Sequence, residues 1–352
     1  MTVVYIILAI LLFGVLIVVH EGGHFTAAKL CGVKVNEFAV GMGPAIWKKT
    51  KGETQYSIRC IPIGGYCAMA GEDESSDDPR AFTSQPAWKR AIILVAGSFM
   101  NFVLGLVILL VLYSSAAAFI APIVDGFMDG CPYEGEEGLM AGDRFISIDG
   151  RRIHEYYDVS ECLDNGETVH DIVLRRNGEK LRLDGFRMER IDYDGSGTLY
   201  YGFYFGYEDA TVLTVLRNVW DTAMEFCHWV WDGLSQLVNG EVGVEEMSGP
   251  VGIVDLMAET GEQAESTSDA LYSIFYLGAF IAVNLAMMNM LPIPALDGGR
   301  VFCLIVTAII EKITHKKLDP KYEAYIHAAG MVLLLAFMGF IMFNDIVKLI
   351  KK

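Results

Sequence analysis

The chain has 352 residues, of which 53% are hydrophobic, and its mean hydropathy of +0.37 is high for a soluble protein. Its formal net charge is −17, and residues 121–270 hold 31 acidic against 10 basic side chains. Nucleic acid requires a basic face, so this balance argues against nucleic acid as a partner. Seven cysteines in so long a chain do not indicate a disulfide-stapled miniprotein. The composition favours a membrane protein with an acidic domain on one side of the bilayer.

Four apolar stretches are long enough to cross a bilayer, which takes about 20 residues. They are Val3–Val19, Ala91–Val124, Leu271 to about Leu296, and Ala324–Phe343. A further apolar run, Val301–Ile310, follows the third stretch. The first stretch lacks the basic start and the small-residue cleavage site of a signal peptide, so we expect it to remain as a span.

The distribution of lysine and arginine predicts the side of the membrane that each loop occupies. The loops between spans one and two and between spans three and four hold thirteen basic residues, against three at the C-terminus: Lys29, Lys34, Lys48, Lys49, Lys51, Arg59, Arg80, Lys89, Arg90, Lys312, Lys316, Lys317 and Lys321. With four spans both loops lie on one side, which we expect to be cytoplasmic. The N-terminus, the acidic segment and the C-terminus are then outside.

The loop after the first span is rich in β-forming residues from Gln55 to Ile63 and ends at Gly64-Gly65. We expect β-strands close to the membrane there. A free strand edge would offer backbone groups to an extended peptide whatever its sequence, so residues 55–70 could pair with a substrate as an added strand. A proline at Ile58 should then impair cleavage if the N–H of Ile58 faces the substrate.

The middle segment divides into a small β-rich domain and a helix. Turns at Asp149-Gly150 and Asn177-Gly178 separate alternating runs, which predicts hairpins. Residues 210–238 have helical periodicity and carry three tryptophans. Tryptophan is enriched at the membrane–water boundary, so this helix either lies along the outer surface or packs on the small domain.

Residues 20–24 read HEGGH, the H-E-x-x-H pattern. On a helix, His20 and His24 share one face, so both can bind one metal ion. Glu21 is turned about 100° from His20 and can reach a water beside the metal without being a ligand. The alternative is two unrelated histidines near a helix end. The position at the end of a span favours a functional site, because ionisable groups in a membrane are costly.

A zinc site with two histidines needs at least one more protein ligand. Asp297 lies in the apolar sequence NMLPIPALDGGR, where Pro292 and Pro294 break the helix before it. Broken helices at membrane depth are tolerated where they line a cavity. Asn289 can hydrogen-bond an extended chain or a developing oxyanion. The alternative for Asp297 is a helix N-cap followed by a turn at Gly298-Gly299; beside the HEGGH motif we favour a metal ligand.

Five motifs in this order resemble the site-2 protease family, in particular its bacterial regulator-of-sigma-E type: HEGGH, GMGP, GSFMNF, SGPVGI and NMLPIPALDGG. The resemblance covers nearly the whole chain. It implies intramembrane proteolysis in the bacterial plasma membrane, with one zinc ion per chain and its active site toward the cytoplasm. It also implies single-span substrates already trimmed by a site-1 protease, such as anti-sigma factors, or signal-peptide remnants. The segment EGLMAGDRFISIDG resembles a PDZ domain, of which we expect one where several relatives have two.

The resemblance carries over to individual residues. His20, His24 and Asp297 match the zinc ligands of the family, and Glu21 matches its catalytic acid/base. Positions that the family associates with substrate handling or with the surroundings of the active site are Asn289, Pro292, Asn101, Gly41 and Gly43. For Asn101 the alternative is a hydrogen bond between helices. For the two glycines it is backbone geometry alone.

The expected fold is a multi-span α-helical membrane protein with about four transmembrane helices, a membrane-associated β-rich loop and an inserted extracytoplasmic PDZ-like α+β domain. Residues 1–120 and 266–352 form the two parts of the membrane core, residues 121–208 the PDZ-like domain, and residues 209–265 a linking helical segment. Two other functions compete with proteolysis. A metal transporter would carry polar residues along several spans, and a silent PDZ scaffold would need neither Glu21 nor Asp297.

The orientation is testable by cysteine labelling. In intact cells, Asn177→Cys should react with a membrane-impermeant reagent, above the labelling of the unsubstituted chain, and Thr314→Cys should not. Both should react in permeabilised cells. The reverse pattern in intact cells would overturn the orientation drawn from the basic residues.

Overall fold

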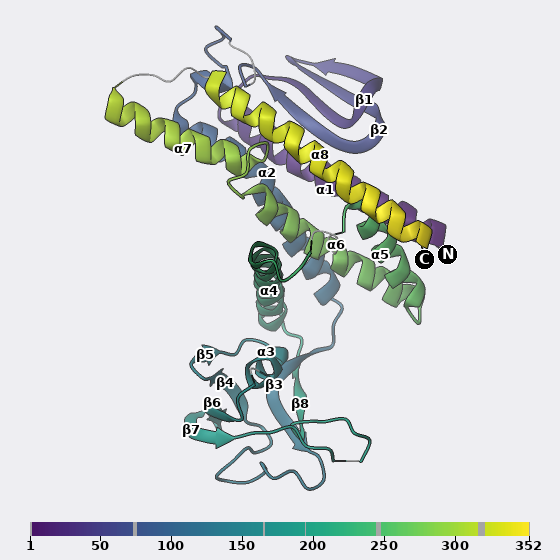
Figure 1. Cartoon of the computed structure of the whole chain (residues 1–352), viewed down its shortest axis with the longest axis vertical. Helices are drawn as coiled ribbons and strands as arrows, with labels where there is room; N and C mark the ends of the chain where they lie inside the picture. The colour runs from purple at the N-terminus through teal and green to yellow at the C-terminus, as the bar shows by residue number, and fades with distance from the viewer. Residues whose placement is uncertain are drawn as a thin grey trace. The chain divides into compact units, whose positions relative to one another are not determined.

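The computed structural model describes residues 2–72, 76–164, 166–193, 195–243, 248–315 and 321–351. It divides into two compact units. The first comprises Met1–Leu112 with Ala223–Lys352, and the second comprises Tyr113–Thr222. The first unit is mainly helical and the second mainly β-sheet, as Figure 1 shows for each.

The helices of the first unit include four that are long and apolar enough to cross a membrane. The helices are α1 (Thr2–Leu30), α2 (Ala87–Tyr113), the C-terminal part of α4 (Val212–Asn239), α5 (Pro250–Gln263), α6 (Thr267–Asn289), α7 (Asp297–Thr314) and α8 (Lys321–Lys351). The candidate spans are Val3–Leu30, Ala87–Tyr113, Thr267–Asn289 and Tyr325–Lys348. The prediction of a membrane protein with about four spans is confirmed at this level. The run Val301–Ile310 lies within α7, which is not among the candidates.

The second membrane helix is shorter than the apolar stretch Ala91–Val124 that predicted it. Helix α2 ends at Tyr113, and the strand β3 (Ala118–Phe127) begins soon after it. The interior of β3 is buried in the second unit, with Ala121 at 2% and Val124 at 0% exposure. A hydropathy window does not separate a membrane helix from a buried strand, which explains the wrong boundary at Val124. The third span likewise ends early, at Asn289.

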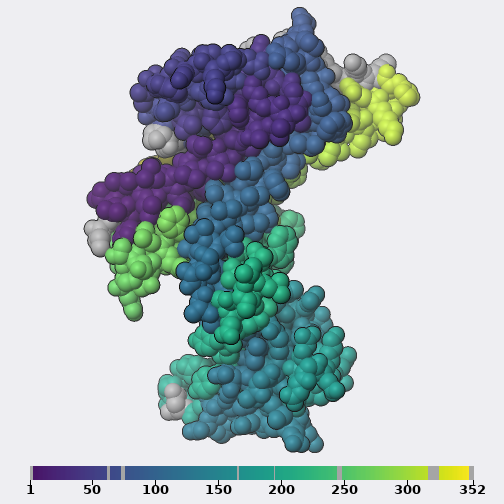
Figure 2. Space-filling model, turned by 180° about the vertical axis from the view of Figure 1, so that it is seen from behind, coloured from purple at the N-terminus to yellow at the C-terminus, as the bar shows by residue number. Residues whose placement is uncertain are grey.

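Helix α1 has one buried and one exposed apolar face. Leu12 and Leu16 are buried in a core cluster shared with α5 and α6. Ile7, Leu11 and Val15 recur every fourth residue and are all more than half exposed, so they form a stripe along the surface. Figure 2 shows the length of this helix open to the outside. An exposed apolar stripe of this kind is suited to contact lipid.

Strands β1 (Val35–Lys51) and β2 (Thr54–Met69) form an antiparallel sheet beside α1. Each strand bends, so each pairs twice. Phe38 pairs with both Tyr56 and Cys67. One face of the sheet packs on α1 through the rings of Phe38 and Tyr56 against Phe25. On the sheet, Arg59 donates to Glu37 at 2.8 Å.

The register shows that Ile58 does not lie at a free edge, so the condition for an effect of proline there is not met. This residue pairs with Val40 on one side and with Trp47 on the other, so its strand segment is interior. Within the described residues, the outer segments of the sheet are 45–51 and 65–69. The alternating sequence predicted strands correctly, but it did not show that each long strand folds back to cover the other.

The second unit is built on a sheet with strand order β7-β6-β4-β3-β8, and β5 pairs with β4. The remaining elements are β4 (Arg144–Ile148), β5 (Arg151–Arg152), α3 (Tyr156–Leu163), β6 (Val169–Arg176), β7 (Glu179–Arg187) and β8 (Phe203–Asp209). Both predicted hairpins form, and all four of their turn residues have φ between 50° and 88°, as the Asp-Gly and Asn-Gly turns require. The likeness of this unit to a PDZ domain remains a prediction.

A buried aspartate of α8 caps α5. Asp345 is 2% exposed, and its Oδ2 accepts the backbone N–H groups of Gly249 and Gly252 at 3.0 and 2.9 Å. A Cβ on Gly249 would lie 2.8 Å from that oxygen, so the glycine permits the approach. The first amides of a helix have no partner within it, and a carboxylate satisfies them and the helix dipole.

Removing this cap should destabilise the first unit. Asp345→Ala leaves two buried N–H groups without an acceptor, so we expect the free energy of unfolding to fall by about 1–3 kcal/mol. Denaturant unfolding in detergent measures the change. Asp345→Asn keeps an acceptor oxygen and should lose less; equal losses in the two variants would contradict the capping role.

Candidate metal centre

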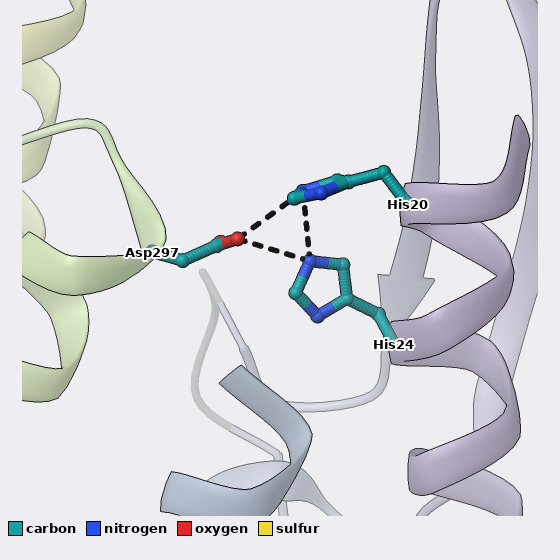
Figure 3. A group of neighbouring side chains, drawn as sticks. All are labelled: His20, His24 and Asp297. Atoms are coloured by element: carbon teal, nitrogen blue, oxygen red, sulfur yellow. Dashed lines mark hydrogen bonds and ion pairs between the residues drawn. The ribbon is translucent and has the colours of Figure 1, made fainter. Parts of the chain in front are cut away.

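Three side chains converge inside the first unit (Figure 3). His20 and His24 lie one turn apart on α1, and their Nε2 atoms are 3.2 Å from each other. Asp297, at the start of α7, places Oδ2 at 3.2 Å from each Nε2. His24 is buried and the other two are partly buried. The helix period therefore brings the histidines together, and the fold brings in the carboxylate.

Helix α2 supports His24 from behind. The Nδ1 atom of His24 lies 2.8 Å from the carbonyl oxygen of Ile93, which accepts only, so Nδ1 carries the proton. The Nε2 atom is then left with its lone pair. A Cβ on Gly97 would collide with the rings of His24 and His20, so glycine is needed where α2 crosses this part of α1.

Asn101 supports His20 in the same way. It is fully buried on α2, and its amide lies 3.3 Å from Nδ1 of His20. The contact is made by the amide nitrogen, and the amide oxygen Oδ1 has no hydrogen-bond partner. The two ends of an amide have nearly the same shape, and turning this amide by 180° lets Oδ1 accept from Nδ1–H. That orientation satisfies the oxygen and frees Nε2 of His20. Asn101 thus makes a hydrogen bond between helices, which was the alternative for this residue, and its partner is the candidate metal ligand His20.

The start of α7 is shaped to present Asp297. Leu296 is the N-cap and Asp297 is the first helical residue, so the N-cap alternative for Asp297 is wrong. Gly298 packs against the backbone of Met290, and Gly299 against that of Ile293, with no room for a Cβ at either position. The LDGG sequence therefore lets the helix begin directly against the loop that precedes it.

The three ligand atoms fit a zinc ion. Bonds of about 2.0–2.1 Å at a tetrahedral angle place ligand atoms about 3.3 Å apart, close to the three separations of 3.2 Å. Oδ2 of Asp297 is buried and has no hydrogen-bond donor. Two imidazole lone pairs and a carboxylate oxygen facing one point need a cation there. Three protein ligands leave one position for water or substrate, as in catalytic zinc sites.

Glu21 lies next to this group but faces the sheet. Its Cγ would be 3.3 Å from a Cβ on Gly65, and its carboxylate interacts electrostatically with both histidines and with the backbone of Cys67. The acid is thus placed between the three ligands and the outer strand segment 65–69. The sequence placed Gly97 in the GSFMNF motif and residues 65–69 in the β-rich loop. It did not show that both lie against residues of the centre, because that depends on close backbone approach between distant segments.

The other predicted residues lie outside the three-residue group. Asn289 is the last residue of α6, and Pro292 is exposed in the turn before α7. Gly41 and Gly43 have φ of +85° and +83° at the bend of β1, and a Cβ on Gly41 would lie 2.5 Å from the carbonyl oxygen of Ile61. Backbone geometry accounts for both glycines, as the alternative proposed. A role of these four residues in substrate handling stays a prediction.

These features define a multi-pass membrane metalloenzyme. Residues 8–337 match the model of peptidase family M50, and the chain belongs to this family, the site-2 proteases. It is a zinc metalloprotease, and zinc is its cofactor.

Curated relatives agree over almost their full length. A Clostridium acetobutylicum protein, named provisionally as a zinc metalloprotease, is 35% identical over 97% of each chain. The regulator of sigma-W protease RasP of Bacillus subtilis is 28% identical over 98% of each chain. The zinc metalloprotease RasP of Bacillus licheniformis is 27% identical over 98% of this chain and 99% of its own.

Asn101 should matter for metal binding. Asn101→Ala removes the partner of Nδ1 on His20, and the loss of such an outer partner typically weakens metal affinity about 10- to 100-fold. Chelator competition on the purified protein measures the change. Ser98→Ala is the matched control, since Ser98 is buried one turn away and its Oγ has no partner. Equal affinities of the two variants would remove Asn101 from the centre.

Proposed function

We propose that the chain cleaves peptide bonds within or near the transmembrane helix of single-span membrane proteins, with His20, His24 and Asp297 as zinc ligands and Glu21 as the acid/base. The observation that carries the proposal is the convergence of the three ligand atoms, 3.2 Å apart, in a bundle of membrane helices with Glu21 beside them. Ionisable groups at such depth are costly and are by default functional.

Zinc, when bound, supplies a Lewis acid that polarises the scissile carbonyl and makes water more acidic. The side chains of the protein present the ligand atoms, transfer the proton and bind the substrate. His24 presents Nε2 because the carbonyl oxygen of Ile93 accepts from its Nδ1–H, and His20 presents Nε2 when Oδ1 of Asn101 accepts from its Nδ1–H. Glu21 takes a proton from the attacking water and passes it to the leaving amine. Asn289 would hydrogen-bond the substrate backbone or the developing oxyanion.

A substrate helix must unwind before water can attack, because its amides are already bonded within the helix. The outer segment 65–69 of the sheet lies beside Glu21, so an extended substrate can pair with it as an added strand. This segment lies within residues 55–70, the stretch that the sequence predicts to pair with a substrate. Gly41 and Gly43 bend β1 and so allow the sheet to fold back on itself.

The substrate class follows from the relatives. Two of them are named RasP, one as a regulator of sigma-W protease. We infer single-span substrates of the anti-sigma-factor kind, trimmed first by a site-1 protease. The residues 121–208 would act as one PDZ-like domain outside the bacterial plasma membrane, and the active site would open toward the cytoplasm. This topology rests on the thirteen basic residues of the two loops.

The two competing functions are less well supported. Among the described residues, one group of three or more His, Cys, Asp or Glu has metal-binding geometry, whereas a transport path needs several such positions. A scaffold without catalysis has no use for a carboxylate that lies beside the three ligands. The next experiment distinguishes transport and scaffolding from proteolysis.

Replacing Glu21 should separate catalysis from metal binding. In Glu21→Gln the shape is kept and the proton acceptor is lost, so cleavage of a single-span reporter should fall at least 100-fold while zinc content stays the same. Measurements are reporter cleavage in cells and zinc content of the purified protein. Unchanged cleavage would exclude Glu21 as the acid/base.

Replacing Asp297 should remove the metal itself. The wild-type chain should hold about one zinc ion, as expected for a mononuclear catalytic site. Asp297→Ala leaves two protein ligands, so zinc should be lost on dialysis and cleavage should cease. Full zinc content and activity in this variant would exclude Asp297 as a ligand.

A further inference from the structure

Helix α8 contributes none of the three ligands, yet it touches the loop that carries one of them. Its contacts are with Pro294 and Ala295, the third and second residues before Asp297. The side chains of Val332 and Leu333, further along the helix, are 70% and 71% exposed. The helix therefore meets the rest of the first unit through one face, and the contacts to the loop lie on that face.

The first contact is a hydrogen bond to a strained residue. Ala295 has a φ of 85°, a left-handed conformation that side chains other than glycine rarely adopt. Its backbone N–H donates to Nδ1 of His327 at 3.4 Å. Such strain persists only where the surroundings impose it, and it gathers at functional sites.

The second contact is a close approach of backbones. Gly330 follows His327 by three residues, so both lie on the same face of α8. A Cβ on Gly330 would lie within 2.7 Å of the backbone carbonyl group of Pro294. Any side chain at residue 330 would push the loop away from α8. Because this loop leads into Asp297, the position of Asp297 would shift with it.

We propose that His327 and Gly330 are positioning residues, which hold the Pro294–Ala295 turn so that Asp297 points at His20 and His24. This proposal rests on the assignment of Asp297 as a zinc ligand. The Oδ2 atom stands 3.2 Å from both Nε2 atoms, and ligand geometry of this kind tolerates displacements of only about 0.5 Å. The last span thus sets the position of a ligand that belongs to another helix.

Glycine substitutions along α8 test the close approach. Gly330→Ala should weaken zinc affinity about 10- to 100-fold, the usual effect of disturbing a ligand's support. Gly339→Ala, in the same helix, is the matched control, because a Cβ on Gly339 meets nothing within 4 Å. Zinc affinity is measured on the purified full chain by chelator competition, and kcat and KM are measured with a single-span substrate at saturating zinc.

Substitutions at His327 test the hydrogen bond without adding bulk. His327→Ala should weaken zinc affinity, and His327→Asn should retain most of it because the amide oxygen can accept from Ala295. In the Ala295→Gly background the loss caused by His327→Ala should shrink, since glycine holds a positive φ without strain. A general packing defect would show no such dependence on residue 295.

The outcomes separate this proposal from the proposed function. Weaker zinc binding in Gly330→Ala but not in Gly339→Ala, with the Ala295-dependent loss at His327, supports positioning. Equal zinc affinities of the two glycine variants, or a loss at His327 that Ala295→Gly leaves unchanged, overturns it. If Asp297→Ala binds zinc as tightly as the wild type, the ligand assignment itself fails.

Discussion

The structure depends on bringing two imidazoles and one carboxylate to within 3.2 Å of one another inside an apolar bundle. Such groups are costly to bury unless each polar atom finds a partner. The side chains reach one point only if the backbones that carry them approach closely. Gly97, Gly298 and Gly299 each stand where a Cβ would collide with a site residue or with the neighbouring loop. These three glycines therefore serve the metal centre because they have no side chain.

The same constraint sets the chemistry of the ligands. A neutral imidazole offers one lone pair, and the partner of its other nitrogen decides where that lone pair is. Ile93 and Asn101, both on α2, lie at Nδ1 of the two histidines. The carbonyl oxygen of Ile93, and Oδ1 of Asn101 once its amide is turned, accept from Nδ1–H and leave Nε2 for the metal. Helix α2 thus controls the tautomers, α1 supplies the rings, and α7 supplies the charge. No single helix carries a complete site.

The sequence predicted what local periodicity and reactive residue types can reveal. The spacing of His20 and His24 placed them on one helix face, and the acidic residue in an apolar segment marked Asp297. The sequence did not predict the end of α2 at Tyr113, because a buried strand and a membrane helix are equally apolar. It also did not show that Ile58 is paired on both sides, because the alternation of a strand does not reveal which other strand segments will pair with it. Those features are decided by contacts between distant segments.

The arrangement also links metal binding to packing. Two lone pairs and a carboxylate oxygen that face one point repel each other unless a cation lies among them, so the zinc ion offsets a cost that the close approach of α1 and α7 creates. A ligand that binds the folded state alone stabilises that state. The close approaches at Gly97, Gly298 and Gly299 hold the ligands near each other, and the metal turns that proximity into a favourable interaction. Helix packing and zinc binding are therefore two parts of one equilibrium, since a variant that separates the helices weakens the site and the loss of zinc weakens the packing.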